Sequence, residues 1–350
     1  KTDRYPDKWK GTFPELWKLS TPFDVHIKAG RRLYVAGPGV VAAIDIPEPG
    51  DEPKISWRTQ IRGTPHRLLA ADGRLFVVTT DGRVLAFGEE QVTNPQIHTV
   101  SRTTSNEQAD RWTELAKKIA KETDVSSGYA LLLGVGSGRL AEELLRRTNV
   151  SIIAVDADAT KVASLRKKFH EAGWYGTRIS VHVGDPLTFP FPPYLADLVV
   201  SEDSESLVAK LDTKSGDAIY RLLRPYGGTM CLDLPEKRVG KFLQAVEQVK
   251  REGGKVRRAD ELTLLTRQGS LPGAADWSHA GANAANAGAS DDRFLKAPLG
   301  MLWFDGSVRW HRKPGSAVIR VAAGRVFILA DRLLAVDVFT GRHLWEVDLP

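Results

Sequence analysis

Residues 129–138 read YALLLGVGSG and decide the fold of the middle of this 350-residue chain. The first five residues form an apolar run with the length of one buried strand, and residues 139–147 continue with helical spacing. Gly134, Gly136 and Gly138 separate the two. Glycine permits a sharp turn and the close approach of a ligand, and the helix start behind it offers free N–H groups and a positive dipole end. The stretch predicts a strand, a ligand-binding turn and a helix.

The glycine pattern alone suits a dinucleotide, a nucleotide or S-adenosylmethionine, and the elements around it narrow the choice. Helices are predicted at residues 111–122 and 160–172, and the alternation of strands and helices is typical of a parallel α/β sheet. A second strand ends at Asp156, where a carboxylate is placed to accept hydrogen bonds from two ribose hydroxyls. Further strands are predicted at residues 179–183, 196–200 and 229–234; the first ends in GDP (184–186), the second in SED (201–203), and LRPYGG (223–228) precedes the third.

This order of motifs resembles the class I S-adenosylmethionine-dependent methyltransferases over residues 108–268. A nicotinamide-binding fold would predict neither Gly-Asp after the third strand nor Leu-Arg-Pro-x-Gly-Gly before the fifth. The resemblance implies a Rossmann-like α/β domain with a parallel-dominated seven-stranded sheet and S-adenosylmethionine as its cofactor. It implies a loop at Gly134, Gly136 and Gly138, a ribose-binding acid at Asp156 and an adenine-capping acid at Asp185. The neighbouring residues Val135, Ala157, Pro186 and Ser201 complete the expected cofactor site.

The sequence departs from the family at Leu132, where an acid near the methionine amine is usual. Catalytic residues are not specified, because methyl transfer needs mainly positioning. Glu202 and Asp203 are candidates for orienting an amine or taking a proton, or they cap the following helix. His182 is expected to be a packed residue. FPPY (191–194) is similar to the NPPY signature of amino-methyltransferases, but its position favours a proline-rich loop.

The flanks of this domain contain a repeat. Residues 30–45, 73–87 and 324–337 each read as turn, strand, turn and strand. Tyr34 and Phe76 occupy equivalent places 42 residues apart, which suits one four-stranded propeller blade. The third copy continues as AVDVFTGRHLW, ending at Trp345.

The third copy resembles the tryptophan-docking motif of pyrroloquinoline-quinone-type β-propellers. Asp-x-x-Thr-Gly makes a tight turn, and the tryptophan then packs as a flat plug between blades. The first copy reaches Trp57 only after a longer loop, and the second copy lacks the tryptophan. A further strand is predicted at residues 298–304.

We therefore expect three parts: propeller blades in residues 1–100, the methyltransferase-like domain in 101–268, and a continuation blade in 269–350. Three blade equivalents cannot close a ring of four or more, so other blades or a protein partner would have to complete it. Quinone binding is not expected from part of a ring.

Composition excludes several classes of protein. The net charge is +6, from 49 basic and 43 acidic residues, and the basic clusters at 166–168 and 255–258 are short, which argues against nucleic-acid binding. No apolar run approaches the roughly 20 residues of a membrane span. The single cysteine, Cys231, lies in an apolar run and reads as a buried strand residue. Since no histidine pair has a ligand spacing, no metal is predicted.

The sequence predicts methyl transfer to an unidentified acceptor, with the propeller segments as a recognition or assembly platform. The alternative is a non-catalytic scaffold with a degenerate domain. Cofactor supply favours the cytoplasm, whereas propellers of this type are commonly exported, which leaves the periplasm open. Because the chain starts at Lys1 rather than methionine, we expect a processed or excerpted chain, and the lack of a leader does not decide the compartment.

Overall fold

The computed structural model describes residues 15–90, 92–98, 109–251, 253–304, 318–329 and 332–349. It divides the chain into two units, residues 1–98 and 99–350, which are described one at a time. None of the helices in the described ranges has the length and apolarity needed to cross a membrane.

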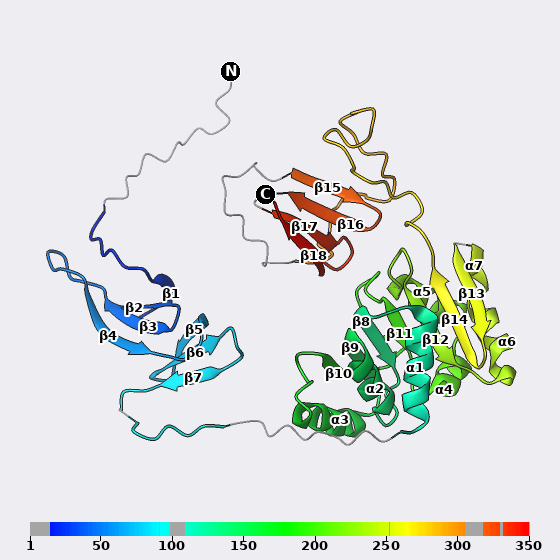
Figure 1. Cartoon of the computed structure of the whole chain (residues 1–350), viewed down its shortest axis with the longest axis horizontal. Coiled ribbons are helices and arrows are strands. Elements are labelled where there is room, and N and C mark those ends of the chain that lie inside the picture. Colours follow the sequence, from blue (N-terminus) through cyan, green and yellow to red (C-terminus); the bar gives the residue numbers. More distant parts are fainter. Residues whose placement is uncertain are drawn as a thin grey trace. The chain divides into compact units, whose positions relative to one another are not determined.

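The first unit consists of two antiparallel sheets with one shared core (Figure 1). Val41 of the first sheet and Leu68 and Val77 of the second are buried together. Trp57 packs edge-on against Phe87, with ring centroids 5.4 Å apart, so the tryptophan of the first repeat lies against the last strand of the second. The strands are β1 (Asp24–Ala29), β2 (Arg32–Gly37), β3 (Val40–Asp45) and β4 (Lys54–Gln60), then β5 (Pro65–Ala71), β6 (Arg74–Thr79) and β7 (Val84–Phe87).

The second unit is built on a seven-stranded sheet in the order β10-β9-β8-β11-β12-β14-β13. Its strands are β8 (Ser127–Leu133), β9 (Asn149–Asp156), β10 (Ile179–Val183), β11 (Leu198–Val200), β12 (Thr229–Asp233), β13 (Gly254–Ala259) and β14 (Leu262–Arg267). The first five in this order are parallel, and β14 pairs antiparallel with both β12 and β13. The predicted parallel-dominated sheet of seven strands is confirmed.

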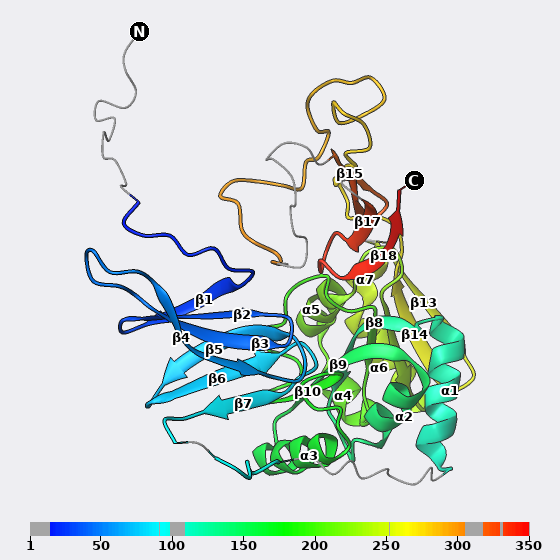
Figure 2. The same ribbon diagram turned by 60° about the vertical axis from the view of Figure 1, so that its left-hand side comes forward.

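Helices cover both faces of this sheet and bury two separate apolar layers (Figure 2). One layer contains Ile119, Leu144 and Phe169 from α1, α2 and α3, and the other contains Val208 and Phe242 from α4 and α6. The helices are α1 (Arg111–Thr123), α2 (Arg139–Arg147), α3 (Ala159–Glu171), α4 (Ser204–Lys210), α5 (Thr213–Leu222), α6 (Glu236–Ala245) and α7 (Glu247–Arg251). A sheet buried on both faces explains why its strands read as continuous apolar runs.

A four-stranded antiparallel sheet ends the chain, formed by β15 (Val318–Ala322), β16 (Arg325–Leu329), β17 (Arg332–Asp337) and β18 (His343–Asp348). The prediction of a strand at residues 298–304 is wrong, because this segment is coil and pairs with no described strand. It is held instead by Trp303, whose indole N–H donates to the Val338 carbonyl at 2.8 Å. Trp345 packs on Phe327 of its own sheet, with ring centroids 6.0 Å apart.

The C-terminal sheet contacts the α/β domain at the amino edge of the parallel strands, where Arg224, Asp197 and Ser127 lie just before or at the start of β12, β11 and β8. The Arg224 guanidinium donates to Asp337, whose side chain is fully buried. Arg342 lies 3.8 Å from Asp197 and 3.4 Å from the Ser127 hydroxyl. Burial raises the pKa of Asp197, although the Tyr129 N–H and the two arginines oppose the rise.

Asp337 joins the predicted turn to this contact. Its Oδ1 accepts hydrogen bonds from the Phe339 and Thr340 N–H groups at 2.9 and 3.0 Å, which closes the Asp-x-x-Thr-Gly turn. Its Oδ2 is the oxygen that pairs with Arg224. One carboxylate therefore shapes the hairpin between β17 and β18 and attaches it to the α/β domain.

Cys231 provides a probe of folding, because it lies buried in the middle of β12. Burial raises the pKa of its thiol to about 12, so the reactive thiolate is scarce at neutral pH. We expect an aromatic disulfide reagent to label the native chain slowly and the urea-unfolded chain at once. Fast labelling of the native protein, measured spectrophotometrically, would contradict the buried position.

Candidate functional site

The predicted cofactor residues lie at the carboxyl edge of the parallel strands, opposite the edge that holds the C-terminal sheet. Backbone hydrogen bonds join the strand ends there: the Gly134 N–H donates to Val155 at 2.9 Å, and the Gly184 N–H donates to Asp156 at 2.9 Å. The Glu202 N–H donates to the Gly134 carbonyl at 3.2 Å. The ends of β8, β9, β10 and β11 therefore form one continuous rim.

The glycine-rich turn connects β8 to α2 with left-handed backbone at Gly134, Gly136 and Gly138, whose φ angles are 83°, 51° and 77°. The left-handed backbone favours glycine at Gly138, and a Cβ there would lie 2.7 Å from the Leu165 side chain, which would have to shift. Gly138 is the N-cap of α2 and offers no side-chain cap. The N–H groups of the helix start therefore need partners from elsewhere.

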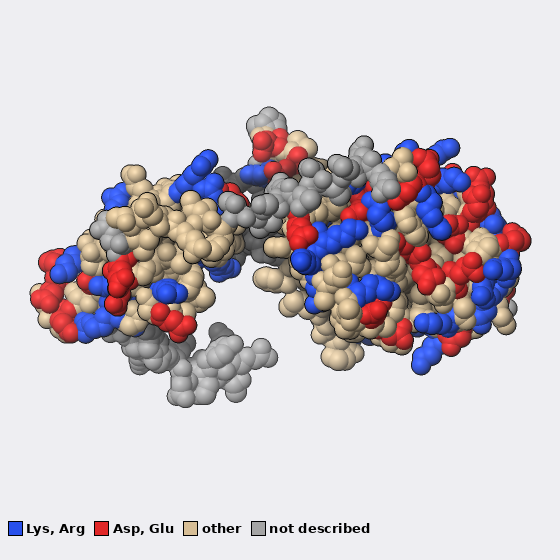
Figure 3. Space-filling model, turned by 90° about the horizontal axis from the view of Figure 1, so that it is seen from below, with Lys and Arg blue, Asp and Glu red and all other residues tan. Residues whose placement is uncertain are grey.

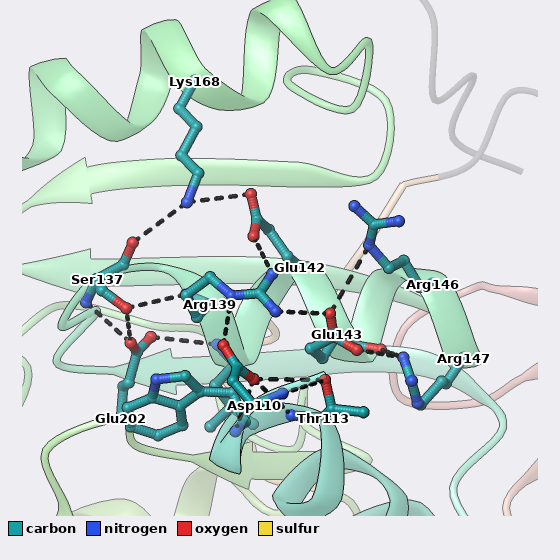
Figure 4. Close-up of polar contacts among 12 residues, drawn as sticks. Asp110, Thr113, Ser137, Arg139, Glu142, Glu143, Arg146, Arg147, Lys168 and Glu202 are labelled. Carbon is teal, nitrogen blue, oxygen red and sulfur yellow. Dashed lines mark hydrogen bonds and ion pairs between the residues drawn. The ribbon is translucent and has the colours of Figure 1, made fainter. Parts of the chain in front are cut away.

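A network of charges fixes α2 behind the turn (Figure 4). Arg139 donates to Asp110 at 3.0 Å, to Glu143 at 2.9 Å, and to Glu142. Lys168 of α3 reaches Glu142 at 3.0 Å. Burial alone would lower the pKa of Arg139, but the hydrogen bonds to the three carboxylates raise it above its ordinary value. These contacts bind α1, α2 and α3 together and hold the turn in place.

Asp156 at the end of β9 is 8% exposed and fully engaged by its own chain. One carboxylate oxygen accepts from the Val135 N–H at 3.1 Å and from the Lys161 ammonium at 3.1 Å, and the other accepts from the Asp158 N–H at 3.0 Å. Burial raises the pKa of Asp156, but these hydrogen bonds outweigh it and the net pKa is lowered. The carboxylate is therefore ionised at neutral pH.

The other predicted cofactor residues follow the same rim. Asp185 is exposed after β10, and its Oδ1 accepts from the Leu187 N–H at 2.9 Å. Pro186 beside it is half-buried, and Ala157 after β9 is exposed. Ser201 is buried after β11, and its hydroxyl would lie 3.5 Å from a Cβ on Gly134. The sheet thus brings the ends of four strands to one edge, although the residues come from separate motifs.

The two candidate catalytic acids point to different elements. Asp203 is the N-cap of α4 and accepts from the Ser206 N–H at 3.3 Å, as the capping alternative expected. Glu202 instead reaches across to the glycine-rich turn and accepts from the Ser137 N–H at 2.9 Å and from the Ser137 hydroxyl. Leu132, at the position of the missing acid, is buried in the core between the sheet and α1–α3.

A cleft of about 430 Å³ adjoins Glu202 on the rim. The end of β11, the loop after β12, the start of α1 and the turn between β13 and β14 enclose it. Its lining contains five carboxylates and one guanidinium, from Glu202, Asp203, Glu205, Asp233, Glu261 and Arg111. A larger hollow of about 830 Å³ lies on the first unit, against β2–β4, and has no glycine-rich turn.

Residues 130–227 match the family model described as a methyltransferase domain. These residues include the glycine-rich turn, Asp156, Asp185 and Glu202. This part of the chain is therefore similar to a methyltransferase domain. The match supports S-adenosylmethionine as the cofactor of this domain.

Crystal structures of two proteins are similar to the methyltransferase domain. One is a protein from Methanococcus maripaludis described as an S-adenosyl-L-methionine-dependent methyltransferase, at 19% identity over 45% of this chain and 85% of that chain, with a TM-score of 0.40. The other is a methyltransferase from Aquifex aeolicus, at 16% identity over 43% of this chain and 87% of that chain, with a TM-score of 0.35. No curated protein matches the sequence.

The rim of the α/β domain fits the chemistry of S-adenosylmethionine. Ribose hydroxyls and an adenine amino group donate hydrogen bonds, and Asp156 and Asp185 offer carboxylate oxygens to them. The Lys161 side chain is 38% exposed, so water competes with the ion pair that it forms with Asp156. Gly134 is open around its Cβ position except for Ser201, which leaves space for a ligand.

Sequence reasoning missed Lys161, which donates to Asp156, and Ser137, which donates to Glu202. Lys161 follows Asp156 by five residues, across the start of α3, and this spacing is the signal that could have found it. His182 is half-buried beside Phe189, with ring centroids 5.7 Å apart. The ring of Tyr194 in FPPY packs against the ring of Phe339 in the turn between β17 and β18, with centroids 5.7 Å apart, which supports a structural role for that loop.

Proposed function

We propose that this protein transfers a methyl group from S-adenosylmethionine to an acceptor bound in the cleft beside Glu202. The main observation behind this proposal is the Asp156 carboxylate, which is ionised, buried and hydrogen-bonded to the Val135 N–H of the glycine-rich turn. This contact holds a carboxylate against the turn, which supports the proposal that Asp156 accepts hydrogen bonds from the ribose. When bound, S-adenosylmethionine supplies an electrophilic methyl group.

The residues of the rim would each have a distinct task. Asp156 would hold the ribose after Lys161 moves aside, and Asp185 would hold the adenine amino group. The glycine-rich turn, fixed by the Arg139 network, would keep the cofactor in one position, which is the main requirement of methyl transfer. The acidic lining of the cleft favours a cationic or hydrogen-bond-donating acceptor, such as an amine.

The acceptor is not expected to be a nucleic acid. Figure 3 shows that basic and acidic side chains are intermixed over the face of the molecule in that view. A nucleic-acid site would instead need lysines and arginines gathered on one surface. We propose further that the repeat-derived sheets are an assembly platform, and that the protein works in the cytoplasm, where the cofactor is made.

A non-catalytic scaffold is the second candidate, and the internal pairing of the rim favours it. Asp156 accepts hydrogen bonds from Val135, Asp158 and Lys161, and one oxygen of Glu202 accepts from Ser137. A domain that never binds a ligand has no need for free acceptors. The scaffold would then bind partners through its antiparallel sheets.

Isothermal titration calorimetry of the full chain with S-adenosylmethionine separates the two candidates. Measurable heat with one site per chain is expected for a methyltransferase. The slow labelling of Cys231 verifies that the domain is folded during the titration. Absence of binding by a folded chain would remove the methyltransferase proposal and leave the scaffold.

A further inference from the structure

The amino-acid end of S-adenosylmethionine poses a chemical problem for this site. That end carries an ammonium and a carboxylate, and each needs an opposite partner to leave water. The start of α2 suits the carboxylate, because its N–H groups carry a partial positive charge. An ammonium needs a carboxylate beside it, and Leu132 cannot provide one because it is an apolar side chain in the core.

Glu202 is the carboxylate that reaches this place. It follows β11, whose Val200 pairs in register with Leu132 of the adjacent strand β8. Its N–H donates to Gly134 at 3.2 Å, and its side chain then extends over the turn. A Cβ on Gly136 would lie 2.8 Å from the Glu202 carboxyl carbon, so the carboxylate rests directly on the glycine backbone.

The two oxygens of Glu202 are unequally engaged. Oε1 accepts two hydrogen bonds from Ser137, one from its N–H at 2.9 Å and one from its hydroxyl. Among the residues that the structure describes, Oε2 has only a long contact of 3.4 Å from the Leu140 N–H. Ser137 therefore fixes the side chain, while Oε2 keeps most of its capacity to accept a stronger donor.

We propose that Glu202 binds the methionine ammonium of S-adenosylmethionine and replaces the acid that the domain lacks at Leu132. This inference rests on the proposed function. It assigns Glu202 to cofactor binding rather than to proton transfer. The carboxylate is supplied from the strand beside the glycine-rich turn instead of the strand that leads into it.

The test compares two ligands that differ only at the amino-acid end. S-adenosylhomocysteine has the ammonium and carboxylate, whereas methylthioadenosine has the same adenosine and a neutral sulfur without them. Glu202→Gln is expected to lower the affinity for S-adenosylhomocysteine by about tenfold to a hundredfold. This is the loss expected when one hydrogen bond to a charged group is removed. Methylthioadenosine affinity should not change.

Asp203→Asn is the matched control, because it removes the adjacent carboxylate, which caps α4. It should leave both affinities unchanged. Equal loss for both ligands, or no loss for either, would overturn the assignment. Tighter binding of S-adenosylhomocysteine by Glu202→Gln would overturn it too, since Glu202 would then compete with the ligand carboxylate for α2. If the wild-type chain binds neither ligand, the proposed function fails together with the inference.

Discussion

Replacing Arg224 by methionine is expected to destabilise the unit formed by residues 99–350 by about 3–5 kcal/mol, the usual cost of leaving a buried charge without its partner. The Asp337 side chain is fully buried, and the Arg224 side chain is 13% exposed. Asp337 would keep the hydrogen bonds of its own turn but lose its countercharge. Urea unfolding of the full chain measures the change, and limited proteolysis should release the C-terminal sheet first.

Two further variants make this prediction specific. Arg332→Met removes an arginine of the C-terminal sheet. This arginine pairs with Glu346, and both side chains are about half exposed. A surface pair of this kind contributes at most about 1 kcal/mol. Adding Asp337→Asn to Arg224→Met should recover much of the loss, because the amide can still accept the turn hydrogen bonds without a charge. If Arg224→Met costs no more than Arg332→Met, the buried pair does not hold the sheet.

Replacing Asp156 by alanine is expected to lower the affinity for S-adenosylmethionine by about a hundredfold or more. Two ribose hydroxyls would each lose a hydrogen bond to a charged group, worth about 1.5–3 kcal/mol. The loss should exceed that of Glu202→Ala, because the ribose contacts involve two donors. Titration calorimetry with the full chain gives both values under one set of conditions.

Lys161→Met is the matched variant for Asp156. It removes the ammonium that lies 3.1 Å from the carboxylate. Since the ribose and the ammonium would compete for the same oxygen, binding should be unchanged or tighter. A loss of affinity in Lys161→Met equal to that in Asp156→Ala would show that the pair acts as a structural unit rather than as a ligand site.

The core of the α/β domain could be predicted from local sequence. The strand of residues 129–133 and the helix of residues 139–147 appear as β8 and α2, the helix with unchanged bounds. A buried parallel strand is an uninterrupted apolar run, and a glycine turn marks its end, so both signals are local. The end of the second strand at Asp156 was also predicted, because the carboxylate directly follows an apolar run.

Contacts between distant motifs could not be predicted in this way. Arg224 and Asp337 lie 113 residues apart, and each belonged to a local motif that explained it without the other. The direction of Glu202 was also unavailable, because a residue after a strand can turn to either neighbouring loop. The apolar run 298–304 suggested a strand, but strand formation needs a free sheet edge in register, and composition does not report one.

The attachment of the C-terminal sheet at the amino edge has a consequence for energetic independence. β8 spans residues 127–133, so Ser127 and Gly134 lie about 20 Å apart along the strand. Changes separated by more than about 10 Å, with no shared partner, usually add without coupling. Variation at the Arg224 contact can therefore tune how firmly the sheet is held while the ligand affinity set by Asp156 stays constant, which leaves the two ends of the domain free to diverge separately.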